Sequence, residues 1–360
     1  MQIGLIGLKN SGKSTLFTIL TGRHDTEPDR SDLTIQGIFT TFDSRLETLQ
    51  KLCKSKKQVH PSFEILDLPP IVALKDAVES VSSKILEEVK NCDALIQVVR
   101  QFTNPAVPAD LTNPDPVTEK SNLDTELVFV DLAIVENRLE RIEKMKNKSP
   151  DFCQPGEIEL LEKCKDTLEN ENPLSVLDLD ASSEKLLRGY QFLTIKPRVT
   201  IINIDEEEIP NSSVWIDRLE NSFPAQKGAF EAICCRTEQE ILELSEEEQV
   251  EFRKDLGIEE PASKKVAVIL MDTIRLIRFL TVGDPAAQSW IIPEGTAANK
   301  AAGTIHTDIE RGFIRAELVT YDNFVKYGSI AKCKENGCFR LEGKDYIVKE
   351  GDVIMVRFNV

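Results

Sequence analysis

Short apolar runs with the length of buried strands recur along the chain, at residues 3–6, 63–67, 93–99, 199–203 and 232–235. Amphipathic segments typical of helices separate them, first at 15–20 and then at 72–90. Strands that alternate with helices in this way are typical of a parallel sheet covered by helices. The pattern therefore predicts an α/β fold with a mostly parallel sheet.

The spacing of apolar residues changes in the middle of the chain. After a loop rich in Pro, Asn and Asp at 103–122, apolar residues follow at 4-3-4-3 spacing, at Val128, Leu132, Val135, Leu139 and Ile142. A second helix comes after the breakers at 149–156, with inward positions at Ile158, Leu161, Cys164 and Leu168. This heptad seam predicts two antiparallel helices in a short coiled-coil hairpin. The hairpin is either an arm that binds a partner or an insert that packs on itself, and both interpretations stay open.

The last third of the chain predicts a separate module. Helices are expected at 238–256 and 265–280, and short strands with turn signals and one helix follow, typical of a small α+β domain. For His306 and Asp308 we expect a structural hydrogen bond, because no nucleophile accompanies them. A chain of 360 residues exceeds the size of one core, so several domains are expected. The predicted domains are an α/β domain at 1–122 and 196–277, a helical coiled-coil insert at 123–195, and a C-terminal domain at 278–360.

Composition excludes several classes of protein. Hydrophobic residues make up 41% and charged residues 29%, as in ordinary globular proteins, and no apolar run approaches the roughly 20 residues that cross a bilayer. The eight cysteines are scattered without a C-x-x-C pair, which favours reduced thiols and a cytoplasmic location. The net charge is −17, yet residues 278–360 hold 11 basic and 11 acidic residues and sum to zero. The acidic remainder disfavours binding to bare nucleic acid, so any RNA contact is expected in the neutral C-terminal part or on a local basic patch.

One motif predicts the chemistry. Gly7 and Gly12-Lys13-Ser14 fit G-x-x-x-x-G-K-[ST], between a predicted strand and a predicted helix. Such a loop directs backbone N–H groups at phosphate oxygens, its lysine reaches the outer phosphates, and the Ser hydroxyl is a Mg²⁺ ligand. The expected phosphate-binding residues are Asn10, Ser11, Gly12, Lys13, Ser14 and Thr15.

Two further residues are candidate Mg²⁺ ligands beside Ser14. Asp67 ends the predicted strand 63–67 and would hold the metal through a water, although an Asp there can also be a simple cap. Thr34 lies where the first switch of P-loop proteins is expected, but a plain loop threonine is an equal alternative. Beyond Asp67, Pro70 stands where D-x-x-G has a glycine that senses the γ-phosphate, and proline has no N–H to do so. Ile71 occupies the place of the water-orienting Gln.

The base-binding edge is predicted from the strand at 199–203. It ends in Asn203-Ile204-Asp205-Glu206, where GTPases carry N-K-x-D with an Asp that binds guanine. Because Glu206 is one methylene longer and Ile204 replaces the lysine, guanine selectivity should be weakened. Cys234 and Cys235 lie at the end of the next predicted strand, and this segment could supply backbone N–H groups near the base.

Taken together, these motifs resemble the YchF/Obg-like ATPases, a branch of the Obg-related P-loop NTPases. Segments that carry the resemblance are 4–17, 43–46, 93–100, 203–206 and nearly all of 279–360, where Ala301-Ala-Gly and the terminal Phe-Asn-Val are most specific. The resemblance implies a G domain with a coiled-coil arm and a C-terminal TGS domain of β-grasp type. It also implies ATP preference with Ile204 on the adenine, Mg²⁺ as cofactor, and association with ribosomes or RNA through the TGS domain or the arm. We expect a monomer with no membrane partner.

The chain departs from the family pattern at the switches. Pro70, Leu74, Val78, Ser80 and Ser82 replace glycines of the second switch, and Pro108-Ala109 lies where the family has a histidine. The binding groups are kept and the switch groups are not, and losing one positioned group costs roughly 10²–10³-fold in rate. Two hypotheses follow: a slow Mg²⁺-dependent hydrolase of ATP or GTP that regulates translation, or a hydrolysis-impaired nucleotide-binding module that serves as an interaction protein.

Overall fold

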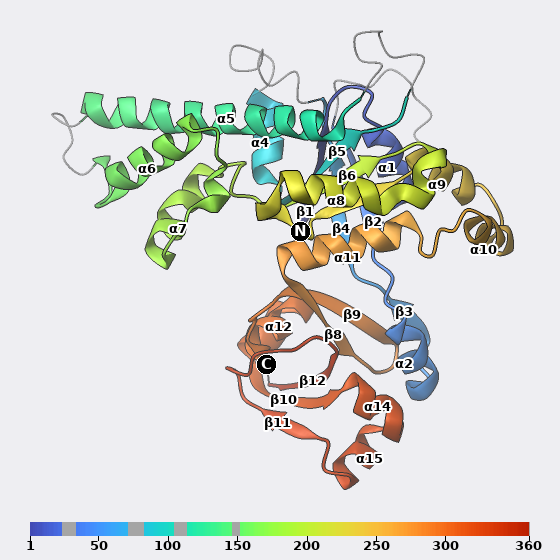
Figure 1. Ribbon diagram of the computed structural model, residues 1–360. Coiled ribbons are helices and arrows are strands. Elements are labelled where there is room, and N and C mark those ends of the chain that lie inside the picture. The colour runs from blue at the N-terminus through green and yellow to red at the C-terminus, as the bar shows by residue number, and fades with distance from the viewer. Residues whose placement is uncertain (24–33, 71–82, 104–113, 146–151, 360) are drawn as a thin grey trace. The chain divides into compact units, whose positions relative to one another are not determined.

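The computed structural model of the chain describes residues 1–23, 34–70, 83–103, 114–145 and 152–359 (Figure 1). The chain divides into two compact units. The first unit comprises Met1–Ile38 and Glu64–Ile269, and the second comprises Phe39–Phe63 and Leu270–Val360. Residues 39–63 thus belong to the same unit as the C-terminal residues, an arrangement that the predicted boundaries do not contain. None of the helices in these described ranges is long and apolar enough to cross a membrane.

The first unit is built on a six-stranded sheet of order β2-β4-β1-β5-β6-β7. Its strands are β1 (Gln2–Gly7), β2 (Ile35–Thr40), β4 (Ser62–Asp67), β5 (Ala94–Arg100), β6 (Arg198–Asn203) and β7 (Phe230–Ile233). β1 pairs in parallel with β4 and β5, and β6 pairs in parallel with β5 and β7. The predicted α/β class is therefore confirmed. Because β4, β1, β5, β6 and β7 run in parallel, their carboxyl ends meet at one edge, which is where ligands bind in such sheets.

Helices connect strands of this sheet, among them α1 (Lys13–Thr21), α4 (Ser83–Asn91) and α8 (Ser212–Ser222), the last flanked by short 3-10 turns at Glu206–Asn211 and Pro224–Gln226. After β7, the last of its strands in the sequence, come α9 (Cys235–Leu242), α10 (Glu246–Asp255) and α11 (Ala262–Ile274), and α11 continues into the second unit. The single helix predicted at 238–256 is wrong, since the chain breaks between α9 and α10. Ser245 and Glu248 form a reciprocal capping box that starts a new helix there. The helix predicted at 265–280 is also too long, because residues from Leu276 onward form a strand.

The helical insert packs on itself along the predicted seam. It consists of α5 (Pro116–Met145), α6 (Glu157–Glu169), η3 (Leu174–Val176), α7 (Ala181–Leu187) and η4 (Arg188–Tyr190). Val128, Val135 and Ile142 of α5 share one buried cluster with Leu161 and Cys164 of α6, and Figure 1 shows the two helices running side by side. The pairing of the two helices is confirmed. The seam is covered by the insert itself, so it is not available to a partner.

Polar contacts fix both ends of the hairpin. Asp131 of α5 is fully buried and accepts hydrogen bonds from the backbone N–H groups of Leu193 (2.9 Å) and Thr194 (2.8 Å). Burial raises the pKa of Asp131 to about 6. Burial would also raise the pKa of Glu157, but hydrogen bonds from Arg138 and other donors lower it to about 2. The remaining donors to Glu157 are the Tyr190 hydroxyl and the Gln154 backbone N–H.

The start of α5 differs from the prediction. Residues 116–122 were expected in a loop, yet the helix begins at Pro116. Proline is favourable in the first turn because its missing N–H has no partner there, and Asp115 accepts from the Thr118 backbone N–H. Directly after these extra turns, Leu123 and Leu127 join the apolar core that contains Leu95 and Ile202 of the first sheet.

The second unit contains a mixed sheet of order β11-β10-β12-β8-β9-β3. Its strands are β8 (Leu276–Thr281), β9 (Ala286–Pro293), β10 (Phe313–Thr320), β11 (Arg340–Glu342), β12 (Asp352–Phe358) and β3 (Lys57–Val59). β8 and β9 are antiparallel, whereas β12 pairs with β8, and β3 with β9, in parallel. Its helices are α2 (Arg45–Cys53), α12 (Ala298–Ile305), α13 (Thr307–Arg311), α14 (Tyr321–Tyr327) and α15 (Ile330–Glu335). Within the described residues after 281 there are thus more helices than the one predicted.

Apolar clusters lie on both faces of this second sheet. Leu318 packs with Ala298 and Ala301 of α12, whereas Val319, the next residue of β10, packs with Leu49 of α2. Adjacent residues of a strand point to opposite faces, so α12 and α2 cover different sides. The predicted structural role of His306 is confirmed: its Nδ1 accepts from the Asp308 backbone N–H at 3.1 Å and caps α13.

Candidate functional site

The P-loop connects β1 to α1 through a tight turn. Asn10 and Gly12 adopt left-handed conformations, with φ of 64° and 89°. At Gly12 this conformation favours glycine, and an added Cβ would also lie only 2.0 Å from Nδ2 of Asn203. A Cβ on Gly7 would lie 2.7 Å from the Val98 carbonyl oxygen. Both glycines of the motif are therefore required by close backbone approach.

Lys13 and Asp67 meet directly behind this loop. The Lys13 Nζ lies 2.7 Å from Asp67 Oδ1, and the two side chains are 9% and 6% exposed. The pairing of Leu5 with Asp67 in the β1–β4 register brings the carboxylate to the level of the P-loop. Lys13, predicted to bind phosphate, and Asp67, predicted to hold the metal through a water, thus lie in direct contact beside the P-loop.

The other two predicted Mg²⁺ ligands lie in different surroundings. Ser14 is exposed in the first turn of α1. Thr34 lies just before β2 and donates its hydroxyl hydrogen to the Glu88 carboxylate of α4. Pro70 lies outside the helices and strands. The other switch positions named above (Ile71, Leu74, Val78, Ser80, Ser82 and Pro108-Ala109) fall outside the described residues.

Asn203 at the end of β6 joins three segments of the site. Its Nδ2 donates to the Ser11 carbonyl oxygen of the P-loop at 3.0 Å, and its Oδ1 accepts from the Cys235 backbone N–H at 3.1 Å. The Asn203 side chain is buried, so neither contact competes with bulk water. One amide therefore fixes the spacing between the phosphate-binding loop and the start of α9.

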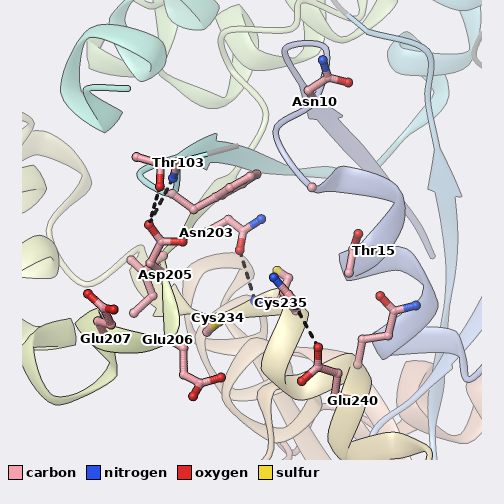
Figure 2. Close-up of a pocket in the computed structure, with 15 residues that line it drawn as sticks. Asn10, Thr15, Thr103, Asn203, Asp205, Glu206, Glu207, Cys234, Cys235 and Glu240 are labelled. Carbon is pink, nitrogen blue, oxygen red and sulfur yellow. Dashed lines mark hydrogen bonds and ion pairs between the residues drawn. The ribbon is translucent and has the colours of Figure 1, made fainter. Parts of the chain in front are cut away.

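Beside Asn203 lies a cavity of about 770 Å³ (Figure 2). The predicted binding residues that line it are Asn10, Gly12, Thr15, Asn203, Ile204, Glu206, Cys234 and Cys235. Ser11, Lys13 and Ser14, also predicted, do not line it. The cavity extends from the P-loop to the loops after β5, β6 and β7, which matches the rule that ligands bind at the carboxyl ends of parallel strands.

The far end of the cavity has the residues predicted to meet a base. Ile204 is 2% exposed, and its backbone N–H donates to the Ile233 carbonyl oxygen at 3.0 Å. Glu206 is exposed and accepts from the Thr237 hydroxyl at 3.1 Å. Burial raises the pKa of the Cys235 thiol, so it stays protonated and contributes through its backbone.

Several residues that line the cavity were not predicted from the sequence. Phe102 and Thr103 follow β5, Asp205 lies inside the Asn-x-x-Glu motif, and Arg236 and Glu240 lie on α9. Figure 2 shows Thr103 beside Asp205, and Glu240 on the helix across the cavity. The signal that could have found Phe102 and Thr103 is their position just past a predicted strand, since the ends of parallel strands converge.

Known families match both ends of the chain. Residues 276–359 match the YchF-GTPase_C family, described as "Protein of unknown function (DUF933)", and residues 2–127 match the family described as "50S ribosome-binding GTPase". Two curated relatives are both named "Ribosome-binding ATPase YchF". The one from Pasteurella multocida is 36% identical over 362 residues, covering 100% of this chain and 99% of the relative, and the one from Bacillus subtilis is 33% identical over 365 residues, covering 100% of each.

A solved structure agrees with these sequence matches. The Schizosaccharomyces pombe YchF GTPase aligns over 99% of this chain and 97% of its own, with a TM-score of 0.81 and 25% identity. Full-length similarity above 30% identity and a shared fold together define family membership, and the predicted resemblance is confirmed. The chain belongs to the YchF family of Obg-related P-loop proteins.

Proposed function

We propose that this chain is a ribosome-binding ATPase that holds ATP and Mg²⁺ at the P-loop and hydrolyses ATP slowly. The observation that carries the proposal is the double contact of Asn203, which ties the P-loop to the start of α9 around a cavity of nucleotide size. The triphosphate would lie against the loop backbone and Lys13, and the base would lie near Ile204.

Mg²⁺ fits the oxygen donors at this site. Ser14 offers an exposed hydroxyl and Asp67 a carboxylate, and Mg²⁺ is commonly bound by one or two protein oxygens together with phosphates and waters. We propose that Ser14 holds the metal directly, Asp67 through a water, and Thr34 once its hydroxyl leaves Glu88. The bound metal would neutralise charge on the transferred phosphate. Lys13 and Asp67 form an ion pair with each other in this structure. When the nucleotide binds, this pair would break, so that Lys13 contacts phosphate and Asp67 the hydrated metal.

The base end favours adenine over guanine. Guanine recognition in GTPases uses a short Asp that accepts two N–H groups, whereas Glu206 is longer and already accepts from Thr237. Ile204 lines the cavity where N-K-x-D has a lysine, so no charged side chain at this position discriminates between bases. We therefore propose ATP as the preferred nucleotide, with weaker binding of GTP.

The partner is proposed from the curated relatives, which are named for ribosome binding. Residues 278–360 have no net charge whereas the remainder is strongly acidic, so the C-terminal part meets the least electrostatic repulsion from RNA. Co-sedimentation of the full chain with purified ribosomes, with and without ATP, tests this part of the proposal. Recovery in the supernatant under both conditions would contradict it.

Calorimetric titration and a turnover assay test the nucleotide chemistry. We expect Mg²⁺-dependent binding of ATP that is tighter than that of GTP, and slow phosphate release. Lys13→Ala should abolish turnover, whereas Lys9→Ala, which removes an exposed lysine from the same loop, should leave it unchanged. The proposal fails if the wild-type chain ignores purine nucleotides in the presence of magnesium.

Pro70 favours a second candidate function. With no N–H at this position, the γ-phosphate loses one sensing contact, and the chain could bind ATP without hydrolysing it. ATP would then stabilise the folded unit by mass action so that it binds a partner. A rise in melting temperature with ATP, combined with turnover no greater than that of Lys13→Ala, would favour this interaction module over the ATPase.

A further inference from the structure

Asp205 and Thr103 form a hydrogen-bonded contact in the cavity to which the proposed function gives no role. Asp205 Oδ2 accepts from the Thr103 backbone N–H at 3.1 Å and from the Thr103 hydroxyl at 3.3 Å. The two residues lie far apart in the sequence, after β5 and after β6, and both line the cavity (Figure 2). One carboxylate oxygen thus connects the segment after β6 to the segment after β5, its neighbour in the sheet.

Phe102 lies between two fixed points because of this contact. On one side, the Gln101 backbone N–H donates to the Asn203 carbonyl oxygen at 2.9 Å, and on the other side Thr103 is held by Asp205. The Phe102 ring lines the cavity and comes within 3.9 Å of the position where a Cβ on Gly12 would stand. The aromatic ring is therefore held between the phosphate-binding turn and the base end of the cavity.

An aromatic ring in that position is suited to a purine. Stacking of a base on an aromatic side chain contributes roughly 1–3 kcal/mol and accepts any base, because every base has a π face. The contribution depends on a ring that is already in place, since a mobile side chain loses conformational freedom on binding. Without the Asp205 contact, Phe102 would keep only its anchor at Gln101.

We propose that Asp205 is a positioning residue that clips Thr103 and thereby presents Phe102 to the purine base. The inference rests on the proposed function, because it assumes that a nucleotide occupies this cavity. It assigns a role to the second x position of the Asn-x-x-Glu motif, where the motif specifies no residue. Asp205 acts on binding of the base and not on the phosphates, so it should change the affinity or KM for ATP and leave kcat unchanged.

Two variants distinguish the effect of the Asp205 charge from the effect of its hydrogen bonds. Asp205→Asn removes the charge but keeps an oxygen that accepts from Thr103, whereas Asp205→Ala removes both. Glu207→Ala is the matched control, since it removes a carboxylate from the same cavity outside the clip. In the full chain with Mg²⁺, we expect Asp205→Ala to bind ATP about tenfold more weakly than Asp205→Asn. Glu207→Ala should bind at least as tightly as the wild type.

A double-mutant cycle shows whether the effect passes through Phe102. In a Phe102→Ala background, Asp205→Ala should cause no further loss of ATP affinity, because the ring that the clip positions is gone. Hydrogen exchange of the Thr103 amide, measured without nucleotide, should be faster in Asp205→Ala than in Asp205→Asn. If Asp205→Ala does not fold, Thr103→Ala removes one of the two contacts and should lower ATP affinity about threefold.

The outcomes separate the clip from the proposed function. Equal ATP affinity in Asp205→Ala and Asp205→Asn, or additive losses with Phe102→Ala, would overturn the clip while leaving the ATPase proposal intact. A wild-type chain that binds no nucleotide would overturn the ATPase proposal itself, whatever the Thr103 amide exchange shows about the contact.

Discussion

A buried group of charges at the root of the insert gives the sharpest prediction on stability. Asp124 of α5 accepts from Lys120 Nζ at 2.5 Å and from the Arg198 guanidinium at 2.8 Å. The side chains of Lys120 and Arg198 are 0% and 3% exposed, and Gln97 also donates to Asp124. Burial would raise the pKa of Asp124, but Arg198 and Lys120 hold it below its ordinary value. The Asp124 carboxylate thus contacts two buried cations at once.

Substitution of Asp124 and substitution of Lys120 should change the free energy of unfolding by very different amounts. At an effective dielectric constant of 20, each pair at this spacing attracts by about 6 kcal/mol before the cost of desolvation is subtracted. Asp124→Asn leaves two buried cations without a counter-charge, and breaking a buried pair in this way costs about 3–5 kcal/mol. Lys120→Met keeps the Asp124–Arg198 pair and places an apolar chain near the Phe223 ring, 4.3 Å from the present ammonium group. We expect its free energy of unfolding to stay within about 1 kcal/mol of the wild type.

Scanning calorimetry at pH 7 and hydrogen exchange of the α5 amides measure the two effects. Asp124→Asn should lower the melting temperature of the first unit and speed exchange in the first turns of α5, whereas Lys120→Met should change neither by much. Equal destabilisation by the two variants would refute the reasoning, because it would show that each charge contributes independently and that desolvation is unimportant.

Three further predictions follow from single residues. Gly12→Ala should lower the free energy of unfolding by about 1–3 kcal/mol and remove most of the nucleotide affinity, because φ is 89° there and the new Cβ meets Asn203. Gly22→Ala is the control: its φ is 65° but no atom lies near the new Cβ, so it should cost only about 1 kcal/mol and leave binding unchanged. Glu157→Gln should cost about 2 kcal/mol at pH 7 once solvent screening is allowed for. Because the pKa of Glu157 falls from 4.5 to about 2 on folding, its contribution is complete above pH 4.5 and lost as the pH drops toward 2, so urea unfolding of wild type and Glu157→Gln should converge in acid. Pro70→Gly restores a backbone N–H and should raise the rate of ATP hydrolysis without changing ATP affinity, as single-turnover assays can measure.

The parts of the fold that local sequence determines were predictable. The strand periods, the heptad seam and the P-loop depend on neighbouring residues, and β1, α1 and the α5–α6 pair appear where the pattern placed them. The break between α9 and α10 could also have been found, since Ser245 and Glu248 have the spacing of a capping box. One helix over 238–256 does not form because Ser245 and Glu248 cap a new helix in its middle.

Pairing between distant segments was not predictable in the same way. β3 is only three residues long, and nothing in its period shows that it pairs with β9 of the C-terminal sheet. Leu46 and Leu49 of α2 have an ordinary amphipathic spacing, which indicates a buried face but not which sheet buries it. The partner of an apolar face is decided by shape and by burial over the whole chain.

The same limit applies to the site, with a consequence for the switch. Thr34 was found by its place after the P-loop, but its contact with Glu88 depends on where α4 lies. Beyond Thr34 the chain runs through β2 into residues 39–63, which pack in the second unit, where Asp43 accepts from the Ser289 hydroxyl at 2.8 Å. A change at Thr34 on nucleotide binding therefore acts at one end of a strand whose other end enters the second unit. If this connection carries a signal, Ser289→Ala should alter ribosome co-sedimentation with ATP more than without it. An equal change in both conditions would show that Ser289 serves only the packing of the second unit.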